Sequence, residues 1–546
     1  MRLQIARRPE RRGLRLWNVG IVLALAFTAA LLVAGFVFNT GWDLLGAREL
    51  KKQPKIDSKT LFDLVKLSFG VVAGAGALVA LVVAYRRQRV DEDGALRDAT
   101  RLHTERFTAA VSQLGDDSAA VRLGGVHALA GLADDAPTRE LRQTCVDVLC
   151  AYLRLPYTPQ SDLLPNDTEA QHAYLSLREV RHTIIRLVRD HLRLPADHPH
   201  SWGELHLDFT NVVFDGGDFS RAVFSGGTVD FSGATFSGGT VDFRGAILLG
   251  GTVDFRGATF SGGTVDFSGA TFSAGTVDFS GAKFSRGTVD FRGATFSGGT
   301  VDFSGATFSA GTVDFQAATF SGGTVTFRAA TFSGGTVTSR EATFSGGTVD
   351  FRGAKFSGST VALGRATFSG GTVDFGEARF SSGTVTFRGA LFLGGTVNFG
   401  QATVSGGRVA FRAATFSAGM VAFDRVTLSG GELDFRETTF NGGMVAFVQV
   451  TLSGGELDFH EATFTGGTVT FQAATFSSGT LNFDEAAFSG GRVAFQSAAF
   501  THGVVDFGVA TFSGSAVDFR GAAGTPPSNL PRTPPLPANI VLAAHW

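Results

Sequence analysis

Three histidines and two aspartates gather just before the repetitive half of the chain and have the composition of a metal site. His191, His198 and His200 lie near Asp190 and Asp197, and imidazole and carboxylate groups are common zinc ligands. No second ligand set with a defined spacing accompanies them, so we interpret this segment as a solvated linker and predict no metal. An enzyme in the helical region would need a pocket around these histidines.

The two cysteines and the many Gly-Gly steps do not predict chemistry either. Cys145 and Cys150 lie five residues apart on a predicted helix, so they do not share a helix face and are expected to be reduced core residues. None of the Gly-Gly steps runs into a Lys-Ser or Lys-Thr at a helix start, as a phosphate-binding loop requires. We therefore predict a protein that is not an enzyme, with no catalytic residue and no cofactor.

The second half of the chain consists mostly of a long internal repeat, and any function has to be argued from this repeat. From Phe231 to Phe519 phenylalanine recurs in alternating steps of five and seven residues, which gives 24 periods of twelve over 288 residues. A short fixed period of this kind indicates a solenoid, whose units are stable only when stacked. The predicted core ladder begins with Phe231, Phe236, Phe243, Phe255, Phe260, Phe267, Phe272 and Phe279.

The start of the array shows a simpler period of five. Leu207-Asp-Phe209, Val212-Val-Phe214, Gly217-Asp-Phe219 and Ala222-Val-Phe224 follow one another at five-residue spacing. This pattern resembles the bacterial pentapeptide-repeat family, and the resemblance covers residues 203 to 523. It implies a right-handed, square-sectioned β-helix with four pentapeptides in each coil.

After Phe224 the sequence departs from that family, because two residues such as Gly227-Thr228 follow every second pentapeptide. The simplest result is a coil made of two twelve-residue periods, with sides of five, seven, five and seven, which we favour over a flattened coil of a single period. The predicted fold class is an all-β right-handed quadrilateral β-helix, preceded by a small α-helical domain and a two-helix transmembrane hairpin.

Two uncharged runs near the N-terminus carry the transmembrane prediction. Residues 16–38 and 67–85 contain no charge and are each long enough to cross about 30 Å of hydrocarbon. A cleaved signal peptide is the alternative for the first run, but no clear cleavage site follows it. Arginines before the first run and after the second favour both termini in the cytoplasm. We thus expect a multi-pass protein of the bacterial cell membrane.

Gly70 and Gly74 place small residues on one face of the second run, which could serve self-association or only pair the two helices of the hairpin.

Apolar residues at helical spacing predict helices over much of 90–202. The run from Ala119 to Ala130 resembles a segment that precedes pentapeptide arrays in membrane-anchored proteins of actinobacteria. The predicted organisation is a basic cytoplasmic tail (1–15), two transmembrane helices (16–38 and 67–85) around a short extracytoplasmic loop (39–66), a helical adaptor (86–202), the solenoid (203–523) and a Pro-rich tail (524–546).

The outer surface of the solenoid is the remaining place for function. Aspartates recur every twelve residues beside the ladder and are predicted to form one or two surface columns that begin with Asp230, Asp242, Asp254, Asp266, Asp278 and Asp290. Residues 203–523 hold 27 Asp and Glu against 19 Lys and Arg, a net charge of −8. Some pentapeptide-repeat proteins protect DNA gyrase by imitating duplex DNA, whose charge density of about one per 1.7 Å is several times greater.

These observations predict a membrane-anchored, non-catalytic scaffold that presents a rod for protein–protein interaction at the cytoplasmic face. The alternative is a DNA mimic that protects or inhibits a topoisomerase such as DNA gyrase. A net charge of −2 for the whole chain gives no general affinity for nucleic acid. The expected partners are a protein, which the sequence does not identify, and the membrane.

Overall fold

The computed structural model describes residues 57–530 and 540–546, together with scattered positions between residues 24 and 40. The chain divides into two units, Met1–Thr104 and Glu105–Trp546. Helix α2 (Ser58–Leu114) is the first long element. It is followed by α3 (Ala119–Asp134), α4 (Arg139–Arg154), the short 3-10 helix η2 (Gln160–Asp162) and α5 (Thr168–Leu192).

The predicted transmembrane hairpin is wrong. In the part of the chain that the structure describes, no helix is both long enough and apolar enough to cross a membrane. Most of residues 16–38 lie outside the described residues. The run 67–85 is one part of the 57-residue helix α2. The multi-pass membrane localisation that rested on the predicted hairpin is therefore not supported.

The small-residue face predicted for self-association lies on α2. Gly70 and Gly74 are one helical turn apart, and, apart from the backbone of their own helix, no atom of the described residues lies within 4 Å of the place where a Cβ would stand at either residue. Self-association through these glycines stays a prediction.

Helices α3, α4 and α5 begin and pack as their sequences require. The Thr138 side chain accepts a hydrogen bond from the backbone N–H of Leu141 (3.3 Å) at the start of α4, and Asp167 does the same for Ala170 (2.9 Å) at the start of α5. A Cβ at Gly125 would lie 2.6 Å from the backbone nitrogen of Leu114, so only glycine lets α3 approach the end of α2 this closely.

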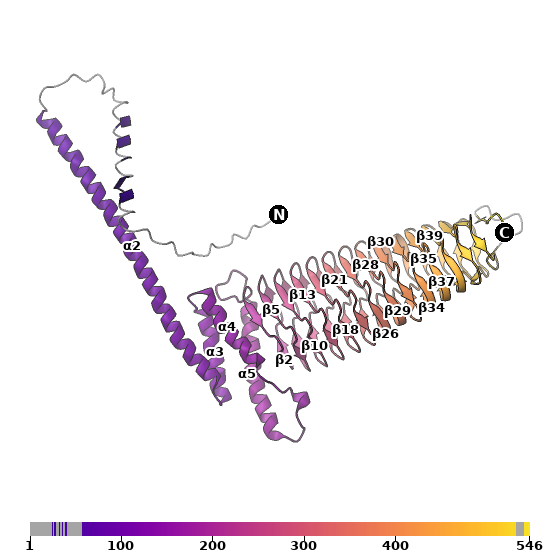
Figure 1. Ribbon diagram of the computed structural model, residues 1–546, viewed down its shortest axis with the longest axis horizontal. Helices are drawn as coiled ribbons and strands as arrows, with labels where there is room; N and C mark the ends of the chain where they lie inside the picture. The colour runs from indigo at the N-terminus through magenta and orange to yellow at the C-terminus, as the bar shows by residue number, and fades with distance from the viewer. Residues whose placement is uncertain are drawn as a thin grey trace. The chain divides into compact units, whose positions relative to one another are not determined.

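Beyond Trp202 the chain forms a right-handed β-solenoid of about 14 coils. One coil consists of β5 (Thr228–Asp230), β6 (Thr235–Phe236), β7 (Thr240–Asp242) and β8 (Ile247–Leu248). The next coil opens with β9 (Thr252–Asp254), which pairs in parallel with β5, so that Thr228 lies beside Thr252. Each such coil therefore spans two of the twelve-residue periods, and Figure 1 shows successive coils stacked in sequence order.

The first coil is shorter than the others. Strand β1 (His206–Asp208) pairs with β5 so that His206 lies beside Thr228, and β2 (Val213–Phe214) pairs with β6 so that Val213 lies beside Thr235. Both offsets fall two residues short of two full periods. From β3 (Gly217–Asp218) and β4 (Val223–Phe224) onward the offset is the full two periods. The change falls between β2 and β3, where the first coil lacks the two-residue insert that separates the equivalent strands β6 and β7.

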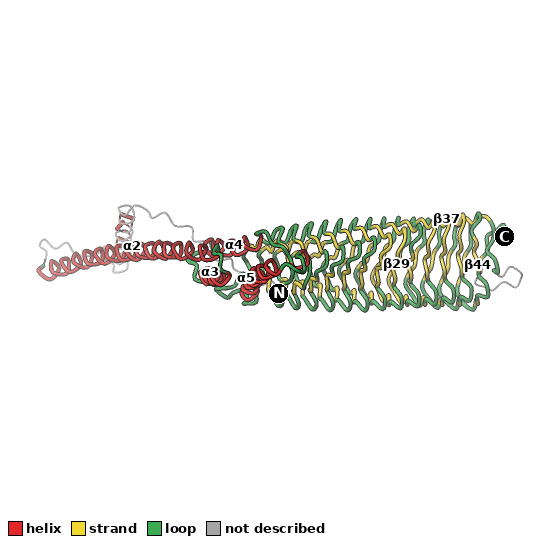
Figure 2. The backbone as a smooth tube through the Cα atoms, turned by 90° about the horizontal axis from the view of Figure 1, so that it is seen from below, coloured by secondary structure: helices red, strands yellow, loops and turns green. Residues whose placement is uncertain are grey.

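The two-residue insert does not always form a corner. In the first half of the solenoid each insert separates two short strands, such as β6 and β7. Later the segment is extended and the two sides merge into one strand of eight residues (Figure 2). These strands are β26 (Lys355–Ala362), β29 (Arg379–Thr386), β30 (Leu391–Asn398), β33 (Thr415–Ala422), β34 (Thr427–Asp434), β37 (Thr451–Asp458) and β40 (Thr475–Asn482). Because the merged sides pair with their separate counterparts, the strands fall into two large sheets.

The tight corners follow each Asp-Phe step or its equivalent, such as Thr470-Phe471, and need a residue with positive φ. In early coils that residue is glycine, for example Gly233 (φ 67°), whereas many later coils place another residue there, for example Ala473 (φ 53°) and Glu485 (φ 59°). A side chain in this left-handed conformation costs about 1–2 kcal/mol relative to glycine.

Both ends of the solenoid are covered. At the N-terminal end, helix side chains bond to the free backbone groups of the first coil: the Gln143 amide bonds to both the N–H (3.0 Å) and the carbonyl (2.7 Å) of His206, and Arg181 donates to the carbonyl of Val213 (2.7 Å). At the other end β48 (Ile540–Val541) pairs with β46 (Ala516–Asp518), and Trp546 lies 5.3 Å from the ring of Phe519. Such cover removes exposed edges that would pair with other chains.

Candidate functional site

The predicted core-ladder phenylalanines all point into the solenoid and stack on their equivalents one coil away. Ring centroids are 4.8 Å apart for Phe231 and Phe255 and 4.6 Å apart for Phe255 and Phe279. The columns of Phe236, Phe243 and Phe272 stack in the same way, at 4.7, 4.8 and 4.7 Å from their next equivalents Phe260, Phe267 and Phe296. All these rings are buried, so they form the core of the solenoid.

Four columns of rings result, and a few rungs lack the ring. One column is interrupted in two successive coils by Ser339 and Leu363, another in three successive coils by Val404, Leu428 and Leu452, and a third near its start by Leu248. Ser339 is the polar exception, and its residue is only 8% exposed.

The predicted aspartate column is two columns, one on each sheet. Asp230, Asp254 and Asp278 are register partners on one sheet, whereas Asp242, Asp266 and Asp290 are register partners on the other. A coil of two periods explains the split, because residues twelve apart lie on opposite sides of it.

Each of these aspartates closes a corner. Asp230 Oδ1 accepts a hydrogen bond from the backbone N–H of Ser232, two residues ahead (2.8 Å), and Asp290 Oδ1 accepts one from Arg292 (2.9 Å). Asp254 and Asp290 are buried. Such Asx turns are a structural use of aspartate, so much of the acidic pattern is explained by the corners.

On the second sheet the aspartate column stops and then resumes. From Asp314 the register partners are in turn Thr338, Ala362, Thr386, Ala410 and then Asp434. A groove of about 790 Å³ lies over these four coils. We call it the arginine groove; its lining residues are Gln316, Arg340, Glu341, Gly364, Arg365, Thr384, Thr386, Arg388, Gly389, Arg408, Ala410, Arg412, Ala413 and Asp434.

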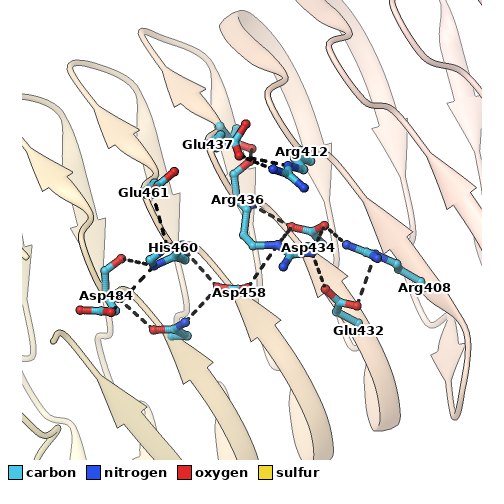
Figure 3. Close-up of polar contacts among 12 residues, drawn as sticks. Arg408, Arg412, Glu432, Asp434, Arg436, Glu437, Asp458, His460, Glu461 and Asp484 are labelled. Carbon is cyan, nitrogen blue, oxygen red and sulfur yellow. Dashed lines mark hydrogen bonds and ion pairs between the residues drawn. The ribbon is translucent and has the colours of Figure 1, made fainter.

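Starting at the far end of the groove, with which it shares Arg408, Arg412 and Asp434, the same face carries a network of ion pairs, which we call the charged strip (Figure 3). It comprises Arg408, Arg412, Glu432, Asp434, Arg436, Glu437, Asp458, His460, Glu461 and Asp484. Arg408 and Arg436 both pair with Asp434, the latter at 3.0 Å, and Arg436 also lies 3.5 Å from Asp458 in the next coil. Arg412 pairs with Glu437 at 2.5 Å.

Burial and ion pairing have opposite effects on the pKa values of the acidic residues in the charged strip. Burial opposes ionisation of Asp434, but hydrogen bonds from Arg436 and Arg408 outweigh it and lower its pKa. Glu432 and Glu456 are register partners in adjacent coils. Burial, together with the neighbouring carboxylates, raises the pKa of Glu456, and burial and Asp434 raise that of Glu432 against the pull of Arg408.

Two groups within the described residues have side chains close enough to share a cation. One is Glu432, Asp434 and Asp458, and the other is His460, Asp484 and Glu485. In the first group Arg408 and Arg436 already neutralise the carboxylates. In the second, the His460 ring nitrogen Nδ1 lies 3.1 Å from the backbone carbonyl of Asp484. We assign a metal to neither.

The histidines and cysteines that the sequence singled out have structural surroundings. His191 stacks on Trp202 at 4.0 Å, and its Nε2 lies 3.1 Å from Asp134 Oδ2. Cys145 and Cys150 are buried, and burial raises their pKa to about 11 and about 12. Such thiols are not nucleophiles at neutral pH.

A second polar cluster joins the helices to the first coil. Asp215, in the corner between β2 and β3, accepts hydrogen bonds from the hydroxyls of Tyr157 (2.5 Å) and Tyr174 (2.7 Å), and His182 lies 3.5 Å away. Burial opposes ionisation of Asp215, but these partners outweigh it and hold its pKa well below the usual range. Its position indicates that it holds the helices on the solenoid.

Sequence reasoning missed the arginine groove and the charged strip. The signal was present, because Thr338, Ala362, Thr386 and Ala410 replace aspartate at every second period in succession. This signal is not visible when the sequence is aligned at a period of twelve residues, because successive periods lie on opposite faces of the solenoid.

Comparison with known proteins finds a family match for part of the solenoid. Residues 209–253, 248–295 and 274–313 match the family model described as pentapeptide repeats (9 copies). The chain has no significant match among curated proteins or among solved structures.

Proposed function

Taking the solenoid as a pentapeptide-repeat β-solenoid, we propose that it is a non-catalytic scaffold that binds another protein through its outer surface. One observation carries this proposal: the interior repeats from coil to coil, whereas the outward residues of one face change from corner aspartates to the arginine groove and then to the charged strip. A rod that served only as a spacer would need no such variation. Solenoids present binding surfaces in this way: the inward residues repeat and keep the coil geometry constant, while the outward residues vary and determine what binds.

A photo-crosslinking scan of the full chain in its source cells tests the proposal. A photoreactive phenylalanine analogue is placed at Thr384, which lines the groove, and at Thr372, a half-buried strand residue on the other sheet, as a matched control. We expect one discrete crosslinked protein from position 384 and none from position 372. Equal labelling at both positions, or none at any outward position of this face, would contradict a specific protein-binding surface.

DNA mimicry is the second candidate and has less support. The aspartates that would imitate phosphates are occupied in corner turns, and arginines such as Arg244 and Arg256 pair with them at 2.5 and 2.6 Å. A DNA gyrase supercoiling assay with the full chain decides the matter. We expect no inhibition or protection at sub-micromolar concentration, and either effect would favour the DNA mimic.

A further inference from the structure

The arginine groove holds an excess of positive charge on an otherwise acidic rod. Five of its lining residues are arginines and two are acidic. Residues 316–413 contain nine Lys and Arg against four Asp and Glu, a net charge of +5, whereas the whole solenoid, residues 203–523, has a net charge of −8. The positive charge is therefore local.

Two of the groove arginines form no ion pair with the described residues. Within that part of the chain no carboxylate oxygen lies within 4 Å of the guanidinium nitrogens of Arg340 or Arg388, while Arg365 pairs with Glu341 at 3.7 Å. On the other sheet, Arg328 and Arg352 follow the corner in the same way but pair with Asp350 (2.7 Å) and Asp374 (2.9 Å) of the next coil. Arg340 and Arg388 lack this pairing because Ala362 and Ala410 stand where those aspartates would be.

The same substitutions open the space above the sheet. Gly364, Gly389, Ala410 and Ala413 provide small residues between the arginines. The groove volume of about 790 Å³ falls in the range of about 300–1,000 Å³ that is typical of ligand sites.

The geometry points to a binding site for a short acidic segment of a partner protein, whose carboxylates would pair with Arg340 and Arg388. This inference deepens the proposed scaffold function and rests on it. Adjacent coils are about 4.8 Å apart, so these two arginines, two coils apart, stand roughly 10 Å apart along the rod, and Arg412 lies one coil further. Guanidinium groups bind carboxylates in bidentate fashion.

The ends of the groove favour a short peptide over a nucleic acid. The aspartate column resumes at Asp314 on one side and at Asp434 on the other, where Glu432 adds a further acid. A nucleic acid strand needs a basic track that follows its backbone, and here that track is bounded by carboxylates.

Fluorescence anisotropy with the full chain tests the inference. The probes are a fluorescein-labelled peptide of eight glutamates, the same peptide with eight glutamines, and a labelled single-stranded DNA of eight nucleotides. We expect the glutamate peptide to bind in a salt-dependent manner, the glutamine peptide not to bind, and R340Q/R388Q to weaken binding at least tenfold. R328Q/R352Q, which removes the same charge from the other sheet, should change binding less than twofold.

Three outcomes would overturn the inference: equal loss in both double variants, no binding of the glutamate peptide by the wild-type chain, or tighter binding of the DNA that R340Q/R388Q abolishes. Because Arg340 and Arg388 are exposed, the variants are expected to keep the fold, and unchanged far-UV circular dichroism checks this. Failure here with a discrete crosslink at position 384 would leave the scaffold proposal in place, so the two failures are distinguishable.

Discussion

Replacing Ser339 by phenylalanine should stabilise the middle of the solenoid. Ser339 takes the place of a ring in the column that contains Phe315 below it and Leu363 above it. Its backbone keeps the corner geometry of a phenylalanine coil: its N–H donates to the carbonyl of Ala362 (2.7 Å), as that of Phe327 donates to the carbonyl of Asp350 (2.6 Å). The substitution thus changes the side chain and leaves the ladder in place.

The size of the effect follows from the surroundings of equivalent rings. Burying a phenylalanine side chain contributes about 1.5–3 kcal/mol, and each ring pair adds about 0.5–1.5 kcal/mol. In S339F one face-to-face pair is regained, with Phe315, because Leu363 lies on the other side. Collapse of the neighbours into the space would cost about 1–3 kcal/mol through overpacking. We expect a net gain of about 1 kcal/mol when the midpoints of these contributions are combined.

Hydrogen exchange of the full chain, followed by mass spectrometry, measures this gain locally, which suits a solenoid whose coils respond to their neighbours. In the wild-type chain, amides around Ser339 should exchange faster than those around Phe327 and Phe351. A gain of about 1 kcal/mol should slow their exchange roughly fivefold in S339F. The matched control F327S, made in an uninterrupted column with rings 4.8 and 4.7 Å away, should accelerate exchange around its own coil.

Uniform protection across these coils in the wild-type chain would show that a missing ring is no weak point. Faster exchange in S339F would show that the coil has already closed around the serine. Either result would refute the argument that each ring stabilises its column through its neighbours.

The remaining predictions concern charge and corner geometry. The pKa of Glu456 is raised in the folded chain, so ionisation of this glutamate opposes folding above that pKa. E456Q should therefore raise the melting temperature at pH 7 and leave it unchanged at a pH where the glutamate is protonated. A difference in melting temperature that does not vary with pH would contradict this. The lowered pKa of Asp215 means that it stabilises the fold above its unfolded value of about 4 and loses this contribution as pH falls. D215N should therefore cost about 2 kcal/mol at pH 7, measured by urea unfolding of the helical end, and a neutral effect would argue against the Tyr157 and Tyr174 bonds. A473G should slow hydrogen exchange of its coil, because it relieves a positive φ at a net gain of about 0.5 kcal/mol, and faster exchange would show that no strain exists there.

The repeat made the solenoid predictable, and the same regularity concealed its surface. The five- and seven-residue steps of phenylalanine identify the inward positions, and the departure at Gly227-Thr228 points to a coil of two periods, as the pairing of Thr228 with Thr252 shows. Helices α3, α4 and α5 also lie where their apolar spacing predicts.

Other features could not be obtained from the pattern alone. The transmembrane prediction rested on the length and lack of charge of residues 16–38 and 67–85, whereas no helix among the described residues is long and apolar enough to cross a membrane. The aspartates were treated as a surface pattern, although hydrogen bonds such as that from Ser232 to Asp230 use them in corners. The arginine groove depends on which residues lie one coil apart, which only the register establishes.

The shortened first coil has a consequence for assembly of the chain. Coils of equal length and nearly equal sequence can pair one coil out of step with little loss of contacts, since Thr would still meet Thr and Phe would still meet Phe. The pairing of His206 with Thr228 and the bonds of Gln143 to His206 exist only when the first coil meets the second. The helical end thus sets the starting phase from which every later coil is counted, and a chain without it would have many equivalent ways to align.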